Sequence, residues 1–262
     1  ATEPQAPGPK TFTLSQPESG RLAFEAQGKK LGEEAYKLER LPTGEYKLSS
    51  QGFFSFNVLA SDVKFEYTQE TRLNADLRPL SFALDFHGPL GLGNRSTKVQ
   101  IEGEQALISS GSDKPREIQV PKERFLLLGM FSSYVLATKM VTGSDPMRLT
   151  AFIAAGFEGP QDQAQEDNTS ALTVPLEFVK LAPVRIRDKA TGKEREVEQY
   201  LLRLGDPDQM DPRSDGSQGP QILASNGEFL GLIGTSEDAS RGDFRVYRMD
   251  LFPQGFEILS AK

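Results

Sequence analysis

The chain contains no cysteine, no tryptophan and a single histidine, His87, among 262 residues. The absence of cysteine excludes disulfide bonds, thiolate nucleophiles and thiolate metal ligands. A zinc site draws on several histidine or cysteine ligands, which one histidine cannot supply. A catalytic histidine needs an orienting acid and a nucleophile, and only Asp85 stands near His87 in the sequence. We therefore expect no catalytic residues, no metal ligands and no cofactor, and hence a protein that is not an enzyme.

Basic clusters and long apolar runs are also missing. The formal net charge is -7, and the lysines and arginines are scattered among acidic residues. Nucleic-acid binding takes its affinity from clustered basic residues that neutralise phosphates, so we expect no nucleic-acid partner. The longest apolar run, 125–137, is shorter than the ~20 residues of a membrane-spanning helix. The sequence thus predicts no transmembrane segment.

Residues 1–10 (ATEPQAPGPK) lack an initiating methionine and are rich in proline, alanine and small polar residues. Such a composition is typical of the chain that follows a signal peptidase site or a lipoprotein tether. We expect an exported protein, periplasmic or extracellular, whose signal peptide has been removed. Residues 1–19 are then a tail or tether and residues 20–262 a single β-rich domain. The polar segment 158–170 is the candidate for an internal division.

Alternating apolar and polar residues fill most of the chain. Apolar residues recur at every second position in 22–26, 63–67, 80–86 and 172–178, the period of a strand with one buried face. The pair Asn226-Gly227 separates two apolar runs and accepts the positive φ angles of a type I′ hairpin. These patterns predict a mainly β fold, namely a large curved antiparallel sheet or half-open barrel with one substantial helix packed on it.

The alternation stops between Glu123 and Thr138, where apolar residues follow one another without a period of two. We predict that this range is the one substantial helix, weakened at Gly129 because glycine disfavours a helix interior. The closing strand of the sheet is expected over 244–252, after the Asn-Gly hairpin.

An acidic segment, 206–215, carries four carboxylates that a calcium ion could use, because carboxylate oxygens are the ligands that calcium prefers. Its spacing departs from the calcium-binding loop pattern, and two prolines stiffen it differently. A solvated acidic turn is the favoured interpretation, and calcium binding is left open. The aspartates are Asp206, Asp208, Asp211 and Asp215.

Phenylalanine is abundant, with 17 residues gathered in a few runs. The simplest interpretation is a core, because large apolar side chains are mostly buried. The functional interpretation is that a curved sheet with a helix across its mouth encloses an apolar cavity for a lipid or another hydrophobic ligand. The residues predicted to line this cavity are Phe82, Leu84 and Phe86 from one strand and Leu127, Phe131 and Tyr134 from the helix.

Four segments carry a resemblance to a known group of proteins: 20–24 (GRLAF), 30–33 (KLGE), 77–82 (LRPLSF) and 245–251 (RVYRMDL). They resemble an uncharacterised family of bacterial periplasmic, exported β-proteins. The resemblance implies a curved antiparallel sheet similar in shape to the lipoprotein carriers that shuttle lipids across the periplasm. It implies no particular catalytic or binding residue.

Together these patterns predict a non-enzymatic extracytoplasmic protein that binds a lipid or another hydrophobic small molecule. The alternative is a scaffold or protein-interaction module of the cell envelope, which would engage a partner protein through sheet edges or acidic loops. An enzyme that acts through carboxylates alone is a third class. It would require a cleft with two acids of separated pKa, which only a structure can reveal.

Overall fold

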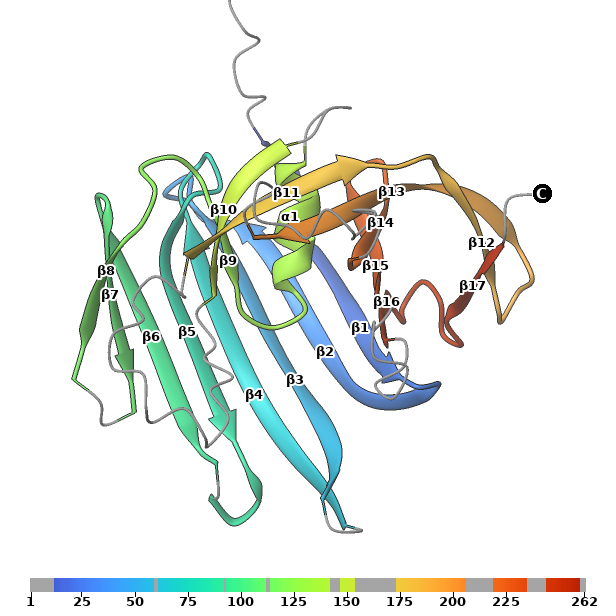
Figure 1. Ribbon diagram of the computed structural model, residues 1–262, viewed down its shortest axis with the longest axis horizontal. Coiled ribbons are helices and arrows are strands. Elements are labelled where there is room, and N and C mark those ends of the chain that lie inside the picture. Colours follow the sequence, from blue (N-terminus) through green and yellow to red (C-terminus); the bar gives the residue numbers. More distant parts are fainter. Residues whose placement is uncertain are drawn as a thin grey trace, which may run out of the picture.

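The computed structural model of the protein describes residues 12–58, 61–91, 93–111, 114–141, 147–153, 173–205, 219–234 and 244–259. In these ranges the chain forms one large curved sheet with a helix inside the curve (Figure 1). The strands of the first half are β1 (Glu18–Ala26), β2 (Lys29–Arg40), β3 (Tyr46–Val58), β4 (Ser61–Leu73), β5 (Pro79–His87), β6 (Arg95–Glu102), β7 (Gln105–Ser110), β8 (Arg116–Gln119) and β9 (Leu126–Leu128).

The second half continues the same sheet. Its strands are β10 (Met147–Ile153), β11 (Thr173–Lys180), β12 (Val184–Asp188), β13 (Glu194–Leu204), β14 (Gln221–Ser225), β15 (Glu228–Gly234), β16 (Phe244–Arg248) and β17 (Phe256–Leu259). The helical elements of the described chain are the 3-10 turn η1 (Pro89–Gly91) and the helix α1 (Ser133–Met140).

The strand order places the two halves side by side. Neighbouring strands run β9-β10-β11-β13-β14-β15-β16-β1-β2-β3-β4-β5-β6-β7-β8, so β1 lies between β2 and β16. Among the described residues no pairing joins β8 to β9, and the sheet is therefore open. This confirms the predicted mainly β fold with a large, barrel-like sheet. The one parallel pair recorded, β9 with β10, makes the sheet mixed.

The strands follow the period-two patterns of the sequence. On β2, for example, Glu34, Tyr36 and Leu38 are buried while Lys37 between them is exposed. The predicted Asn-Gly hairpin is confirmed, since Asn226 and Gly227 join β14 to β15 with φ of 52° and 77°. These left-handed angles are the ones that a type I′ turn requires at its two central positions.

The predicted helix over 123–138 is wrong in its first part. Residues 126–128 form β9, which pairs with β10, and α1 begins only at Ser133. Because residues 125–138 are all buried or partly buried, the run lacks an exposed polar face and its pattern fits a buried strand as well as a helix. The predicted closing strand over 244–252 ends at Arg248, where the chain turns towards β17.

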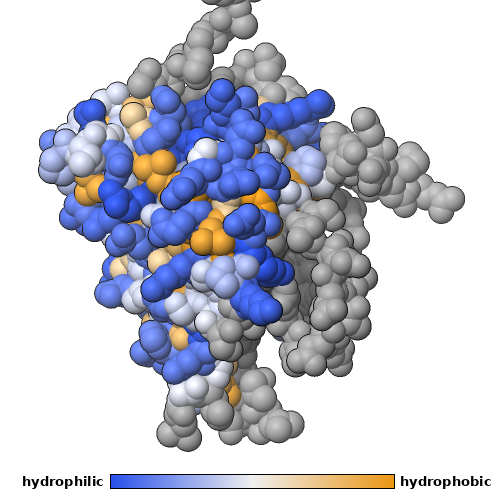
Figure 2. All heavy atoms as spheres, turned by 90° about the vertical axis from the view of Figure 1, so that its left-hand side faces the viewer, coloured by the Kyte–Doolittle hydropathy of each residue, from blue (hydrophilic) through white to orange (hydrophobic). Residues whose placement is uncertain are grey.

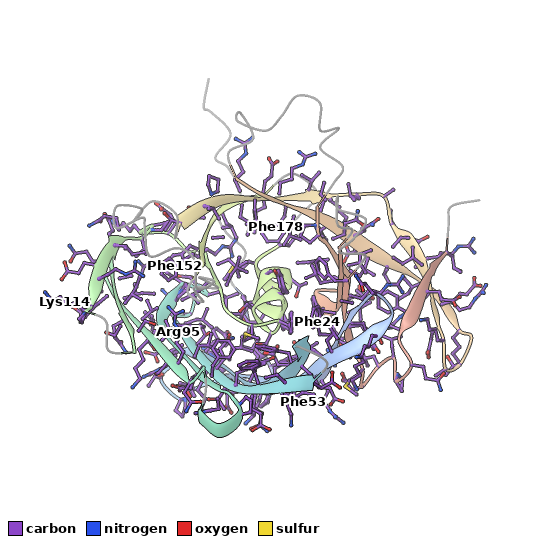
Figure 3. The ribbon with its side chains drawn as sticks, turned by 60° about the horizontal axis from the view of Figure 1, so that its bottom comes forward. Phe24, Phe53, Arg95, Lys114, Phe152 and Phe178 are labelled. Carbon is purple, nitrogen blue, oxygen red and sulfur yellow. The ribbon has the colours of Figure 1, made fainter. Side chains whose placement is uncertain are left out.

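The helix lies within the concave side of the sheet and packs on β9, β14 and β15. Figure 3 looks from below and shows the strands surrounding α1. Two apolar clusters fill the space between helix and sheet. A third lies outside the main sheet, where β12, β17 and the turn before β17 cover the outer side of β1, β15 and β16; it contains Ala23, Ile186, Val197, Leu223, Leu230, Tyr247, Phe252 and Phe256.

Part of the expected N-terminal tail belongs to this fold. Phe12 packs against the core, its ring 5.2 Å from that of Tyr46, and the Tyr46 hydroxyl donates to the Phe12 carbonyl at 3.1 Å. Residues 1–11, the expected division at 158–170 and the acidic segment 206–215 lie outside the described residues. No helix in the described part of the chain is long and apolar enough to span a membrane.

Candidate functional site

Aromatic side chains line up across the concave face of the sheet. Phe24 on β1 pairs with Gly32 on β2, which pairs with Phe54 on β3, and Phe54 pairs with Phe65 on β4. Residues that are paired across neighbouring strands share a face of the sheet, so these side chains form one row. A ring from β5 and a ring from the loop before α1 complete it. The aromatic row consists of Phe24, Phe54, Phe65, Phe86 and Phe131.

The rings of the aromatic row form two contacting groups on either side of Gly32, Phe24 with Phe131 and Phe54 with Phe65 and Phe86. The ring centroids of Phe24 and Phe131 are 4.8 Å apart, and those of Phe54 and Phe65 are 5.6 Å apart. Phe86 meets Phe54 edge-on at 5.9 Å. Phe54 is buried, whereas the other four members are only partly buried. The row therefore marks a border of the packed interior where aromatic surface still meets solvent.

The six residues predicted from the sequence divide between the core and this border. Phe82, Leu84 and Leu127 are at most 2% exposed and belong to a packed cluster. Phe86 and Phe131 belong to the aromatic row, and Tyr134 is partly buried against the other interior cluster. The prediction that these residues bind a ligand stays a prediction.

Three members of the row, Phe24, Phe54 and Phe65, were missing from the sequence-based candidates. Phe24 and Phe65 lie in alternating runs, so their facing the interior could have been predicted, whereas Phe54 stands between Phe53 and Ser55, where the apolar residues do not alternate. That they meet one another depends on the register of β1 to β4, which the pattern of one strand does not define.

A group of buried polar side chains holds Phe131 in the row. Gln69 Oε1 accepts a hydrogen bond from Met130 N at 2.6 Å, and Glu34 Oε2 accepts one from Ser132 N at 3.1 Å. The two backbone groups that flank Phe131 are thus fixed to β4 and β2. The buried polar cluster comprises Glu34, Ser50, Gln69 and Ser132, with Ser132 Oγ 3.1 Å from Ser50 Oγ and 3.3 Å from Gln69 Nε2.

Glu34 is the one acidic member of the buried polar cluster and is 1% exposed. Burial raises the pKa of the Glu34 carboxyl above its usual value, and hydrogen bonds from Ser132 and Ser50 oppose the rise only in part. Tyr67 lies beside it, and burial likewise raises the pKa of the Tyr67 hydroxyl. Glu34 Oε1 and the Tyr67 hydroxyl make no well-aligned hydrogen bond with the described residues. The raised pKa therefore favours a neutral carboxyl at this position.

We expect Glu34→Gln to remove a pH dependence of stability. Because the folded-state pKa of Glu34 is raised, the folded protein binds more protons than the unfolded chain between the usual value of 4.5 and the higher folded-state value. The stability of the wild type therefore falls as the pH rises through this window and stays reduced above it. The glutamine side chain mimics the neutral acid and does not titrate.

Urea unfolding at two pH values measures this effect. The unfolding free energy of the Glu34→Gln variant minus that of the wild type should be larger at alkaline pH than near pH 4.5. Near pH 4.5 the Glu34 carboxyl of the folded wild type is protonated, and the glutamine then replaces a neutral group. An unfolding free-energy difference that is the same at both pH values would show that Glu34 does not titrate in this way.

A cationic side chain stands at the end of the aromatic row. Arg95 on β6 pairs with Phe86 on β5, so both project from the concave face. Figure 3 shows Phe24 and Arg95 on the inner side of the strands that carry them. Arg95 Nε donates to Ser110 Oγ at 3.1 Å, and Ser110 Oγ is 3.3 Å from Thr97 Oγ1. A guanidinium group and two hydroxyls thus adjoin the aromatic rings.

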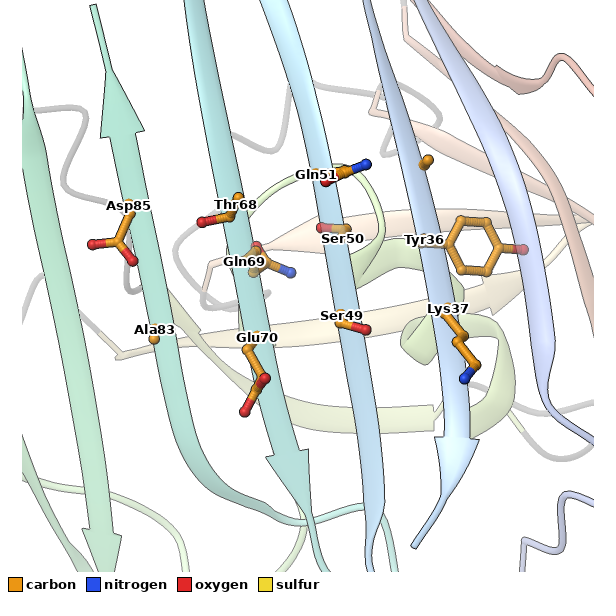
Figure 4. A pocket seen from close by; sticks show the side chains of 11 residues that line it. Tyr36, Lys37, Ser49, Ser50, Gln51, Thr68, Gln69, Glu70, Ala83 and Asp85 are labelled. Atoms are coloured by element: carbon orange, nitrogen blue, oxygen red, sulfur yellow. The ribbon is translucent and has the colours of Figure 1, made fainter.

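The opposite, outer face of the same strands is polar. A hollow of about 610 Å³ lies over β2 to β5, and small or polar side chains such as Ala35, Ser49, Thr68 and Asp85 line it (Figure 4). In this view α1 lies behind the sheet, so the hollow is on the face away from the helix. The flank over β6 to β8 is mainly hydrophilic, with apolar residues in small separate groups (Figure 2).

Asp85 and His87 also lie on the outer face. Asp85 borders this hollow, and His87 borders a neighbouring one together with Glu33 and Glu66. In the described ranges no group of three or more histidine, aspartate or glutamate side chains is placed to hold a metal ion.

No family model matches the chain, and no curated protein matches it. The fold is similar to the crystal structure of a β-barrel-like protein of the domain of unknown function DUF1849 from Brucella abortus. The TM-score is 0.53 at 12% identity, over 93% of this chain and 97% of that one. A DUF1089 family protein from Pseudomonas aeruginosa matches 77% of this chain and 89% of its own, with a TM-score of 0.44 and 12% identity. The first likeness shows a barrel-like β fold and agrees with the expected resemblance to uncharacterised β-proteins.

Proposed function

We propose that this protein is a non-enzymatic binding protein for a hydrophobic ligand, which lies against the aromatic row on the concave face of the sheet. The observation that carries the proposal is the set of partly exposed rings from β1, β4, β5 and the loop before α1. A solvent-facing group of aromatic rings inside a curved sheet is costly for the free protein, because apolar surface is stabilised by leaving water. A bound apolar molecule removes this cost.

The dimensions of the aromatic row fit an extended apolar molecule. The row crosses from β1 to β5, and neighbouring strands are ~4.8 Å apart, so it spans about 19 Å. Phe131 is held against Phe24 by hydrogen bonds to both neighbouring backbone N–H groups. A surface whose rings are fixed before binding loses little conformational freedom when a ligand arrives. An acyl or isoprenoid chain laid across the strands has the matching shape.

Truncation of the row should weaken ligand binding. We expect Phe86→Ala and Phe131→Ala each to weaken the binding of oleyl alcohol about tenfold, because each removes a ring from the apolar contact surface. Displacement of Nile red measures binding without an intrinsic tryptophan, which the chain lacks. Leu107→Ala is the matched control, since Leu107 is apolar, 41% exposed and carried by β7.

The outcomes separate the proposal from its alternatives. Failure of oleyl alcohol to displace Nile red from the wild type, or an equal loss in Leu107→Ala, would remove the basis for a specific site on the row. Native mass spectrometry of the protein from its own source supplies a second reading. A bound hydrophobic compound that is released on denaturation supports the proposal. A stoichiometric protein partner without such a compound supports the envelope-scaffold alternative.

An exported location belongs to the same proposal. A carrier of hydrophobic compounds outside the cytoplasm needs no reducing compartment and no cofactor, and the cysteine-free composition suits such a setting. Fractionation of cells that produce the protein from its own gene tests this point. Recovery with the cytoplasmic fraction would contradict the exported location. It would not contradict the binding proposal, which the ligand titrations test separately.

A further inference from the structure

We infer that the outer face of the sheet carries a second binding site, in which the hollow over β2 to β5 binds a neutral saccharide. The site goes beyond the proposed function, because it lies on the face away from α1 and the aromatic row. Two rows of outward-facing residues, paired across the four strands, form its floor. The first row is Ala35, Gln51, Thr68 and Asp85, and the second is Lys37, Ser49, Glu70 and Ala83.

Small side chains create the hollow. Ala35, Ser49 and Ala83 rise little above the backbone, and longer side chains stand around them (Figure 4). A second hollow of about 350 Å³ adjoins the first and shares Ala35, Gln51 and Thr68 with it. A row from β2 to β5 crosses three strand spacings of ~4.8 Å and is therefore about 14 Å long. A concave surface of this length fits a short oligosaccharide, because ligand sites are concave.

The polar groups on the floor of the hollow are unpaired. In the described part of the chain, four of these side chains form no hydrogen bond or ion pair with the protein. They are Ser49, Gln51, Thr68 and Asp85. Asp85 is nonetheless only partly exposed, so its carboxylate has lost some contact with water without gaining a partner in the protein. Hydrogen-bond donors of a ligand would stabilise such a carboxylate.

The other charged groups of the hollow are already compensated. Lys37 Nζ lies 2.6 Å from a carboxylate oxygen of Glu39, and Glu70 lies 4.0 Å from Lys47 Nζ. Of the two carboxylates that line the hollow, Asp85 alone has no basic partner among the described residues. A single unpaired carboxylate is too little for a polycation, and the acidic surroundings together with the net charge of -7 oppose an anion.

The mixture of donors and acceptors defines the class of ligand. An amide and a hydroxyl each donate and accept, whereas a carboxylate accepts only. A neutral saccharide presents hydroxyl groups that match all three. Phe53 lines the adjoining hollow and is partly exposed, with Lys64 Nζ 4.5 Å from the centre of its ring. This ring gives the C–H groups of a sugar an apolar surface beside the polar floor.

Ligand-observed NMR with neutral trisaccharides tests the site. The probes are maltotriose, cellotriose and triacetylchitotriose. We expect at least one of them to bind the wild type, and Asp85→Ala to weaken its affinity about tenfold, since a hydrogen bond to a charged group has this effect. Ala83→Arg should weaken it as much or more, because a long side chain then occupies the hollow. Glu117→Ala is the matched control, since Glu117 is an exposed carboxylate on β8 and does not line the hollow.

The possible results separate the saccharide from other ligands. If none of the probes binds the wild type, or if Asp85→Ala weakens binding no more than Glu117→Ala does, the inference is overturned. Trigalacturonate and spermidine represent an anionic and a cationic ligand, and tighter binding of either than of every neutral probe also overturns it. The wild-type comparison does not depend on the folding of any variant. The oleyl alcohol titrations test the proposed function on the opposite face, so either proposal can fail without the other.

Discussion

Replacing Arg248 by alanine is expected to lower the free energy of unfolding by about 3 kcal/mol. Arg248 is 4% exposed and donates to both carboxylate oxygens of Asp250, at 2.9 and 2.7 Å. It also donates to Glu228 at 3.1 Å and to the Tyr36 hydroxyl at 2.9 Å. The side chain therefore joins β16 to β15 and β2. The expected loss is at the lower end for a buried ion pair because both carboxylates are partly exposed. Urea unfolding measures it.

Arg187→Ala is the matched control for this loss. Arg187 donates through two nitrogens to Glu194, at 3.1 and 2.6 Å, but its side chain is 44% exposed. An exposed ion pair contributes ~1 kcal/mol or less. A loss in Arg187→Ala as large as that in Arg248→Ala would mean that burial is not the source of the Arg248 effect.

The loss in Arg248→Ala should also depend on pH. Burial alone would raise the pKa of Asp250, but hydrogen bonds from Arg248 and from Arg21 N outweigh it and hold the pKa below its usual range. The stability from a depressed pKa is complete above the unfolded value of about 3.9 and is lost as the pH falls through the folded value. The difference between wild type and variant should therefore narrow in acid below about pH 4.

Gly32→Ala should be comparably damaging, with an expected loss of about 3 kcal/mol. Gly32 stands where the pairing of β1 with β2 shifts register, and it is the one position of the cross-strand row without a side chain. A Cβ atom there would overlap the carbonyl oxygen of Phe53 and approach Phe54 Cα to 3.0 Å. These are backbone atoms of β3, which cannot rotate away, so the strand itself must shift. Thermal and urea unfolding measure the loss.

Gly28→Ala separates this overlap from the general cost of replacing glycine. Gly28 lies in the turn between β1 and β2 with φ of 72°, and a Cβ there meets nothing within 4 Å. Its replacement should cost about 1 kcal/mol through the left-handed backbone angle alone. If Gly28→Ala is as destabilising as Gly32→Ala, the overlap with β3 is not what makes glycine necessary at position 32.

Local patterns predicted the strands well, because a strand with one buried face displays its orientation as a period of two. The runs around Leu22, Val63 and Leu80 and the hairpin at Asn226-Gly227 needed no distant contact to be recognised. The range 123–138 failed for the opposite reason. Its residues from 125 to 138 are all buried or partly buried, so no exposed polar face gives a periodic signal that distinguishes β9 from the helix that follows Gly129.

The candidate site was only partly predictable. Phe86 and Phe131 stood out as aromatic residues beside apolar runs, and both lie in the aromatic row. Arg95 gave no signal, since an arginine at a strand end resembles the many exposed basic residues of this chain. Its inward position follows from its pairing with Phe86. Glu34 likewise reads as a surface acid within an acidic stretch, yet the loop before α1 covers it.

The sequence by itself determined the class of fold and excluded disulfide bonds and thiolate chemistry. Alternation specified the strands, and the absence of cysteine together with a single histidine narrowed the chemistry, because both are properties of composition and nearest neighbours. Only the tertiary structure decided that β1 lies between β2 and β16, that α1 lies inside the curve, and which rings meet on the concave face. Those features depend on the register between strands, and register is defined by contacts between residues that are far apart in the chain.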